Sequence, residues 1–162
     1  NWLQKYPEGK VLQYDQKFAR PYTFIAKLHN FEATKPAWHM QDTPDLIVVV
    51  EIAGAAKAYD WKQLQSAGVV NDTVGEASIV LTTDPARTSA SVYSRAVDGR
   101  ILAFTATEQG MTDTETGSTW NWFGICLDGP MKGKTLTLVQ SYQQYVRAWI
   151  QFHPETTFYE FG

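Results

Sequence analysis

Apolar and polar residues alternate along much of the chain with the period of two that is typical of β-strands. The segment 45–52 (DLIVVVEI) differs, because it is a nearly continuous run rich in β-branched residues between Pro44 and Gly54. Such a run predicts a strand that is covered on both faces. Shorter strands are predicted at 55–61, 68–74 and 77–83.

Turn residues predict two hairpins. The segment 91–106 (SVYSRAVDGRILAFTA) contains two alternating runs joined at Asp98-Gly99, a dipeptide that accepts the positive φ angles of a type I′ turn. A second turn is predicted at Thr116-Gly117, and a last strand at 134–140 (KTLTLVQ). The residues expected to contribute to the core are Val92, Ile101, Leu102, Phe104 and Trp149.

One segment, 141–155 (SYQQYVRAWIQFHPE), has the apolar spacing of a helix, with Ser141 where an N-cap is expected and Pro154 near the predicted end. The chain is therefore predicted to be mainly β. We expect a single antiparallel β-rich domain, of sandwich or barrel type, with a C-terminal helix laid on the sheet. Residues 46–162 are expected to form this core domain with its closing helix, and residues 1–45 a wrapping arm and irregular segment.

Composition and charge narrow the classes of function. The 162 residues are 44% hydrophobic and 14% aromatic, which suffices for the core of one domain. The 14 Lys and Arg and the 17 Asp and Glu are spread along the chain, whereas nucleic-acid binding needs a concentrated basic face. The longest apolar run is too short to cross a membrane, and Glu51 interrupts it. No nucleic-acid partner and no membrane span are therefore expected.

Two histidines and a methionine form the candidate metal site. His29, His39 and Met40 supply the imidazole and thioether ligands that copper or haem iron accepts, which would make the chain an electron-transfer protein. Adjacent residues of an extended segment point in opposite directions, so His39 and Met40 could share one ion only across a turn. A histidine held by backbone hydrogen bonds in a loop is the simpler interpretation, so no cofactor is predicted. The single cysteine, Cys126, is expected to be a buried apolar residue.

The aromatic residues suggest another binding function. Trp120 and Trp122, in the phrase TWNWF, are expected on one face of a strand, where their ring faces could stack on a carbohydrate. Packing in the core is the alternative interpretation for at least one of them. The chain has no G-x-S-x-G elbow, and no catalytic residue is predicted.

Five phrases carry a resemblance to a known family. They are AKAYD (56–60), VVNDTVGE (69–76), VDGRILAF (97–104), MTDTETGSTW (111–120) and WIQFHPE (149–155). In this order they resemble an uncharacterised family of mostly exported bacterial and archaeal proteins, the domain of unknown function DUF3179. The resemblance implies a β-rich fold with a terminal helix and an extracytoplasmic location, whether secreted, at the cell surface or periplasmic.

The family phrases that could carry chemistry are missing from this chain. Members typically have a T-Y-C-P-L-C-G phrase where this chain has LTTDPARTSA (81–90), and a His-Glu pair where it has LQSAG (64–68). The resemblance therefore implies that any metal or redox chemistry is lost. Polar positions that remain are Asn71, Asp72 and Asp113, which are expected to make turns and support hairpins. Replacing either aspartate by alanine is expected to lower the free energy of unfolding by about 1 kcal/mol.

The phrase WLQKYPE (2–8) repeats WIQFHPE (149–155), with Trp, Gln, Pro and Glu at the same positions. The resemblance implies that this phrase closes the module, so the N-terminal copy is interpreted as a displaced closing element. Its Trp2, Tyr6 and Pro7 would need a surface on their own domain or on a neighbouring copy. A heterologous contact that does not close into a ring builds a filament. We therefore expect a non-enzymatic structural or interaction module that forms a homo-oligomer or filament head to tail. The alternatives are the electron-transfer protein and the carbohydrate-binding module.

Overall fold

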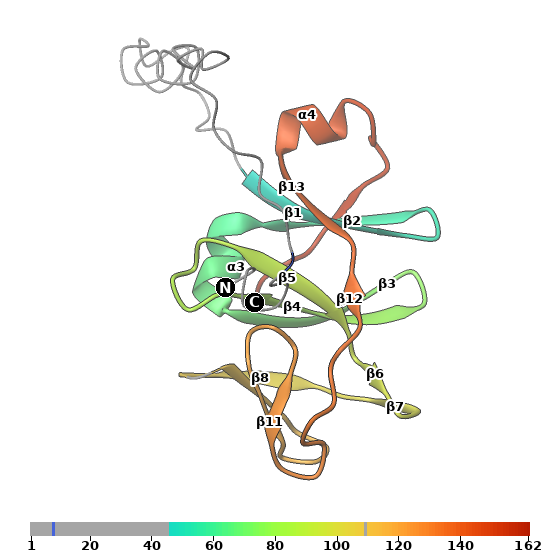
Figure 1. The fold of residues 1–162 in the computed structure, drawn as a ribbon. Coiled ribbons are helices and arrows are strands. Elements are labelled where there is room, and N and C mark those ends of the chain that lie inside the picture. The colour runs from blue at the N-terminus through green and yellow to red at the C-terminus, as the bar shows by residue number, and fades with distance from the viewer. Residues whose placement is uncertain (1–7, 9–45, 109) are drawn as a thin grey trace. The chain divides into compact units, whose positions relative to one another are not determined.

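The computed structural model describes Glu8 and residues 46–108 and 110–162. The chain divides into two compact units, Asn1–Thr43 and Pro44–Gly162, and the elements given below belong to the second unit. Its described residues form three four-stranded sheets, a two-stranded hairpin and two short helices (Figure 1). The predicted mainly β fold with a C-terminal helix is confirmed.

The first sheet contains the strand that was predicted to be covered on both faces. Its order is β13 (Ser141–Tyr145), β1 (Leu46–Ile52), β2 (Ala55–Asp60) and β14 (Thr157–Phe158). The strand β14 runs parallel to β2, and the other neighbours are antiparallel. Residues of β1 alternate between two cores, one on each face of the sheet, and both sets are buried.

The second sheet lies between the other two. Its order is β12 (Leu138–Val139), β5 (Ala90–Ser94), β4 (Ala77–Thr83) and β3 (Val69–Val74), all antiparallel. Side chains of β4 alternate between the core shared with the first sheet and the core shared with the third. Both faces of this sheet are therefore covered.

The third sheet has the order β11 (Cys126–Asp128), β10 (Thr119–Trp120), β9 (Gly110–Asp113) and β8 (Phe104–Thr107). Its β9–β10 pair confirms the hairpin predicted at Thr116-Gly117. The two-stranded hairpin joins β6 (Ala96–Val97) to β7 (Arg100–Ile101). Its turn residues Asp98 and Gly99 have φ angles of 48° and 77°, so the predicted positive-φ turn is confirmed. The paired strands are shorter than the two runs predicted over 91–106, because the flanking residues join β5 of the second sheet and β8 of the third.

Two helices complete the layers. The helix α4 (Val146–Ile150) packs Trp149 on the outer face of the first sheet, at the top of the view in Figure 1. The helix α3 (Trp61–Ala67) contributes to the core between the first and second sheets. Asp60 caps α3 by accepting a hydrogen bond from the backbone of Gln63 at 2.8 Å. No helix among the described residues is long and apolar enough to cross a membrane.

The structure corrects the predicted helix at 141–155. Its first five residues form β13, because they pair with the buried strand β1, and only Val146–Ile150 are helical. The spacing of the apolar residues did not reveal this change, since tertiary pairing overrides local preference. The helix at Trp61–Ala67 was not predicted, because seven residues with two buried side chains give too short a pattern to recognise.

The predicted core is confirmed except at one position. Val92, Leu102, Phe104 and Trp149 are buried, whereas Ile101 is 50% exposed. Ile101 lies in the β6–β7 hairpin, which pairs with none of the three larger sheets. The last predicted strand, 134–140, is shorter than expected, with only Leu138 and Val139 in β12.

Candidate functional site

The strongest candidate site is a group of polar side chains between β2 and β3, which belong to different sheets. Lys57 and Tyr59 lie on the face of β2 that points to the second sheet, because alternate residues of a strand share a face. The Lys57 Nζ lies 2.8 Å from Oδ2 of Asp72 and donates to its Oδ1 at 3.0 Å. The Tyr59 hydroxyl donates to Asp72 Oδ2 at 2.7 Å. We call Lys57, Tyr59, Asp72 and Tyr159 the Asp72 cluster.

The C-terminal residues lie against this cluster. Tyr159 follows β14, and its backbone N–H donates to the carbonyl oxygen of Ala58 at 2.9 Å. Its ring centroid lies 5.4 Å from that of Tyr59 and 5.7 Å from Lys57 Nζ, within reach of a cation–π contact. The end of the chain therefore helps to desolvate the ion pair.

Electrostatics leave the cluster with little capacity for proton transfer. Burial would raise the pKa of Asp72, but hydrogen bonds from Lys57 and Tyr59, with the charge of Lys57, hold that pKa below its ordinary value. Burial, followed by the hydrogen bond to Asp72 and its negative charge, raises the pKa of Tyr59 far above its ordinary range. The carboxylate is thus engaged and the phenol stays neutral, an arrangement that joins two sheets.

Replacing Asp72 by asparagine should lower the free energy of unfolding by about 2 kcal/mol at neutral pH, because a charge-assisted hydrogen bond and an ion pair are lost. The folded-state pKa of Asp72 is depressed. Its contribution is therefore present above the unfolded carboxyl pKa of about 4 and is lost as pH falls through the folded-state pKa. Thermal melts from pH 7 to pH 2 should show the two proteins converging in acid.

The matched control for this experiment is Glu76→Gln. Glu76 lies exposed in the turn between β3 and β4, so its replacement should leave the acid profile of the wild type unchanged. A stability gap between wild type and Asp72→Asn that stays constant down to pH 2 would contradict the assignment.

Asn71, beside Asp72 on β3, joins the second sheet to the third. Its side-chain amide donates to the carbonyl oxygen of Phe104 at 2.7 Å and accepts from the N–H of Phe104 at 2.8 Å. Asn71 and Asp72 both lie within the paired strand β3, which confirms the strand predicted at 68–74, and neither makes the turn expected of it. Asn71-Asp72-Thr73 matches a glycosylation sequence, but in the folded chain the Asn71 amide is already engaged.

Asp113 is fully buried and organises the turn between β9 and β10. Its Oδ1 accepts from the backbone of Thr116 at 2.6 Å, and its Oδ2 accepts from the Thr116 hydroxyl at 2.9 Å and from the Trp120 indole at 2.8 Å. The Ser118 hydroxyl lies 2.7 Å from that of Thr116 and accepts from the backbone of Met131 at 3.0 Å. We call these residues the Asp113 cluster, and its bonds fit the predicted turn-making role of Asp113.

The two tryptophans proposed as a carbohydrate platform do not share a strand face. Trp120 is fully buried in the core beneath the third sheet, and its indole is bound to Asp113. Trp122 is partly exposed in the turn that follows β10. Cys126 is 2% exposed, and burial raises the pKa of its thiol, which agrees with the predicted apolar role.

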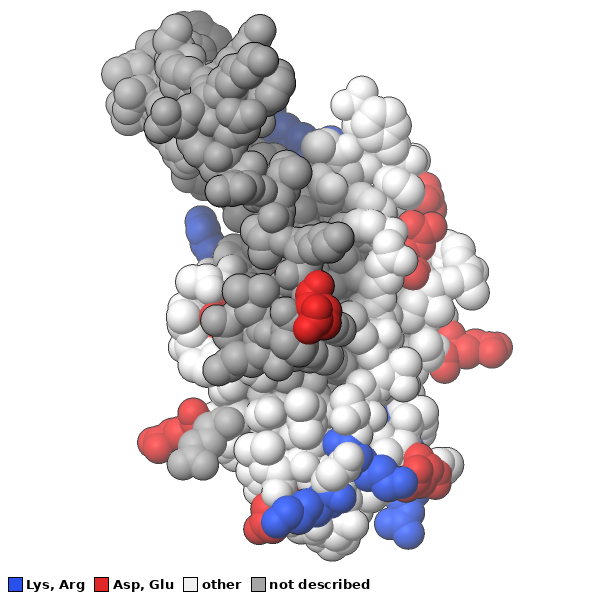
Figure 2. Space-filling model, viewed as in Figure 1, with Lys and Arg blue, Asp and Glu red and all other residues white. Residues whose placement is uncertain are grey.

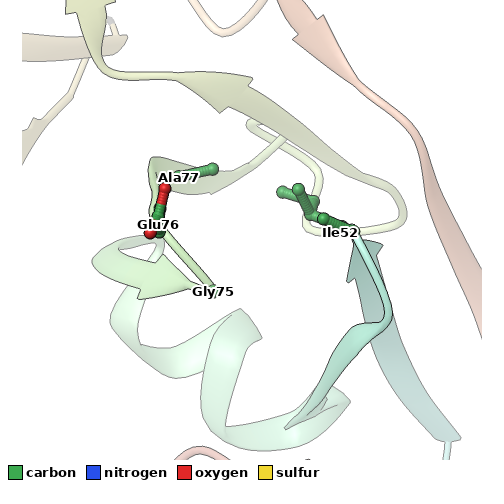
Figure 3. Close-up of a pocket in the computed structure, with 5 residues that line it drawn as sticks. Ile52, Gly75, Glu76 and Ala77 are labelled. Carbon is green, nitrogen blue, oxygen red and sulfur yellow. The ribbon is translucent and has the colours of Figure 1, made fainter.

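A hollow of about 520 Å³ lies between the turn that follows β1 and the turn that joins β3 to β4. Ile52, at the end of β1, faces Gly75 and Glu76 of the β3–β4 turn and Ala77 of β4 across it (Figure 3), and Ala53 completes the lining. The lining is mainly apolar and contains a single carboxylate. Among the described residues, no group of three or more His, Cys, Asp or Glu side chains could hold a metal ion.

Several predicted residues lie outside the described part of the chain. These are the metal candidates His29, His39 and Met40, and the N-terminal interaction residues Trp2, Tyr6 and Pro7. The C-terminal copy of the repeated phrase is described. The indole N–H of Trp149 donates to the Thr156 hydroxyl at 2.8 Å, and the Trp149 ring stacks on the His153 ring with their centroids 3.8 Å apart.

Sequence reasoning missed the partners of Asp72. The available signal was Lys57 in the strand phrase AAKAYD, since a lysine between small apolar residues of a covered strand needs an acidic partner.

Comparison with protein-family models matches residues 1–156 to the family described as "Protein of unknown function (DUF3179)". No curated protein matches the chain, and no solved structure matches it.

Proposed function

We propose that this chain, which belongs to the DUF3179 family of unknown function, is a non-catalytic, extracytoplasmic interaction module. The observation that carries the proposal is the way its polar family residues are used. Asn71, Asp72 and Asp113 each direct their side chains to partners inside the fold. Groups that are bound in this way hold sheets and turns together.

A reactive group must be accessible and must be able to change its protonation or bonding state. Asp113 is buried with its oxygens occupied, and Asp72 is neutralised by Lys57. The Cys126 thiol is buried with a raised pKa, which disfavours the thiolate. These properties support a scaffold that binds through its surface.

The charged side chains on the face shown in Figure 2 also support a protein partner. Among the described residues of this face, the Lys and Arg at the bottom of the view have Asp and Glu beside them. Ion pairs such as Lys134–Asp98, at 2.9 Å, and Lys132–Asp128, at 3.7 Å, also bring opposite charges together on the surface. Nucleic-acid binding needs a concentrated basic face, so we propose no nucleic-acid partner.

The repeated phrase supplies the proposed contact. In the C-terminal copy, Trp149 packs against a sheet face formed by the residues Ile47, Val49, Ala56 and Ala58. The N-terminal copy carries the same tryptophan at the same distance from its proline, as Trp2 and Pro7. We propose that this copy binds a neighbouring chain and so builds a head-to-tail homo-oligomer or filament.

Deletion of residues 1–12 should convert head-to-tail assemblies into smaller species, because the proposed contact loses Trp2 and Tyr6. The mass in solution can be measured by light scattering after size exclusion, against the 18.3 kDa expected for one chain. The double variant Trp2→Ala, Tyr6→Ala removes only these two side chains and should give the same smaller species as the deletion. The same number of subunits in the assemblies of the intact protein and of the shortened protein would refute the head-to-tail contact.

A further inference from the structure

Exposed apolar side chains gather on one continuous segment of the chain. Seven of the nine large hydrophobic residues that are exposed in the described part lie between 123 and 152. The same segment supplies one edge strand of each four-stranded sheet, because β11, β12 and β13 all stand at an end of their strand order (Figure 1). The seven residues are Phe123, Ile125, Leu127, Leu138, Tyr142, Tyr145 and Phe152.

The strand β13 is the longest of these three edges. It pairs with β1 along one side, from Ser141 opposite Val50 to Tyr145 opposite Leu46, and no strand among the described residues pairs with its other side. Residues 142–145 are all exposed. An unpaired edge presents backbone N–H and C=O groups that can pair with another strand.

The edge also lacks the features that usually prevent such pairing. Proteins protect open edges with charged side chains, proline or bulges. Residues 135–146 (TLTLVQSYQQYV) contain no charged residue, proline or glycine. At the chain's average of 19% charged residues, twelve positions would carry about two charges. The segment is therefore unusually permissive for a strand partner.

We propose that β13 pairs antiparallel with β13 of a second copy, across a two-fold axis at Gln143. In an antiparallel ladder, the side chains of directly opposite residues point to the same face of the sheet, whereas neighbouring residues of one strand point to opposite faces. A two-fold axis between two identical strands must therefore place one residue opposite its own symmetry mate. Centring on the middle of β13 places Gln143 opposite Gln143 and Tyr142 opposite Gln144. The two first sheets then become one continuous sheet.

A second copy is the partner that the composition favours. In a two-fold contact each side chain near the axis lies close to its own symmetry mate, so any charge would face an identical charge. The strand β13 avoids this repulsion because it has none. Opposed glutamine side chains can donate and accept hydrogen bonds between themselves. The contact uses residues of β13 and none of Trp2, Tyr6 or Pro7, so it does not depend on the proposed head-to-tail contact.

Cysteine cross-linking tests this pairing in the full chain. Opposed residues of an antiparallel ladder have Cα atoms about 4.5–5.5 Å apart, within the range of a disulfide. Gln143→Cys should therefore form a covalent dimer under mild oxidation, while native Cys126 is buried. Lys132→Cys, at an exposed position away from β13, is the control and should cross-link at least tenfold less. Equal cross-linking of the two variants would overturn the proposal.

Charge substitution provides a second readout. Gln143→Lys places two ammonium groups at the axis and should weaken dimerisation at least tenfold, whereas Gln143→Thr should keep it. Sedimentation equilibrium of the three proteins measures the effect, and circular dichroism checks that each remains folded. Equal association of Gln143→Lys and wild type, or a wild type that is monomeric throughout, would contradict the pairing. The N-terminal deletion should leave the Gln143→Cys cross-link intact, which separates the two proposed contacts.

Discussion

Replacing Asp113 by alanine should lower the free energy of unfolding by about 4 kcal/mol, four times the loss expected from its sequence context alone. The structure explains the increase. Asp113 is fully buried and accepts three hydrogen bonds, two from Thr116 and one from the Trp120 indole. Without the carboxylate, the buried indole N–H has no acceptor, and an unsatisfied buried donor costs about 1–3 kcal/mol by itself.

The measurement is chemical denaturation followed by tryptophan fluorescence, with two companion variants. Asp113→Asn keeps the shape and one acceptor oxygen, so about half of the loss is expected. Asp128→Ala removes the same type of side chain from an exposed position and should cost less than about 0.5 kcal/mol. A loss at Asp113 no greater than that at Asp128 would show that the Asp113 cluster does not hold the turn.

Replacing Gly110 by alanine should destabilise the protein by about 4 kcal/mol, because there is no room for a methyl group at the start of β9. An added Cβ would overlap the carbonyl oxygen of Trp120 and lie 3.0 Å from the Cα of Asn121. Both are backbone atoms, so β9 and β10 would have to separate. That movement would break the pairing of Met111 with Trp120 in the centre of the third sheet.

Gly133→Ala is the matched control for this substitution. Gly133 also has a positive φ, of 85°, but nothing lies within 4 Å of its added Cβ. Only the backbone cost of about 1 kcal/mol for a left-handed conformation is expected there. Thermal unfolding of the two variants should therefore differ clearly, and similar melting temperatures would contradict the close approach at Gly110.

Local sequence features predicted the parts of the fold that depend on neighbouring residues. The dipeptide Asp98-Gly99 specifies its own turn, and the apolar run of β1 reports burial on both faces. The phrase MTDTETGSTW is equally local, since the hydrogen-bond partners Asp113, Thr116 and Trp120 all lie within it. The sequence could therefore suggest a turn at this phrase without any knowledge of the sheets.

Features that depend on distant pairing could not be predicted. Ser141–Tyr145 has helical spacing but forms a strand, because β1 lies beside it in the folded chain. Asp72 and its partners lie on strands of different sheets, 13 and 15 residues apart in the sequence. Their contact depends on how the two sheets stack, which no local pattern encodes. The open edge of β13 became visible only once the strand order was known.

Sedimentation equilibrium of the intact protein over a wide concentration range tests whether this chain acts by binding other copies of itself. We expect a mass that rises with concentration above the 18.3 kDa of one chain. A single species of 18.3 kDa at every concentration would contradict it.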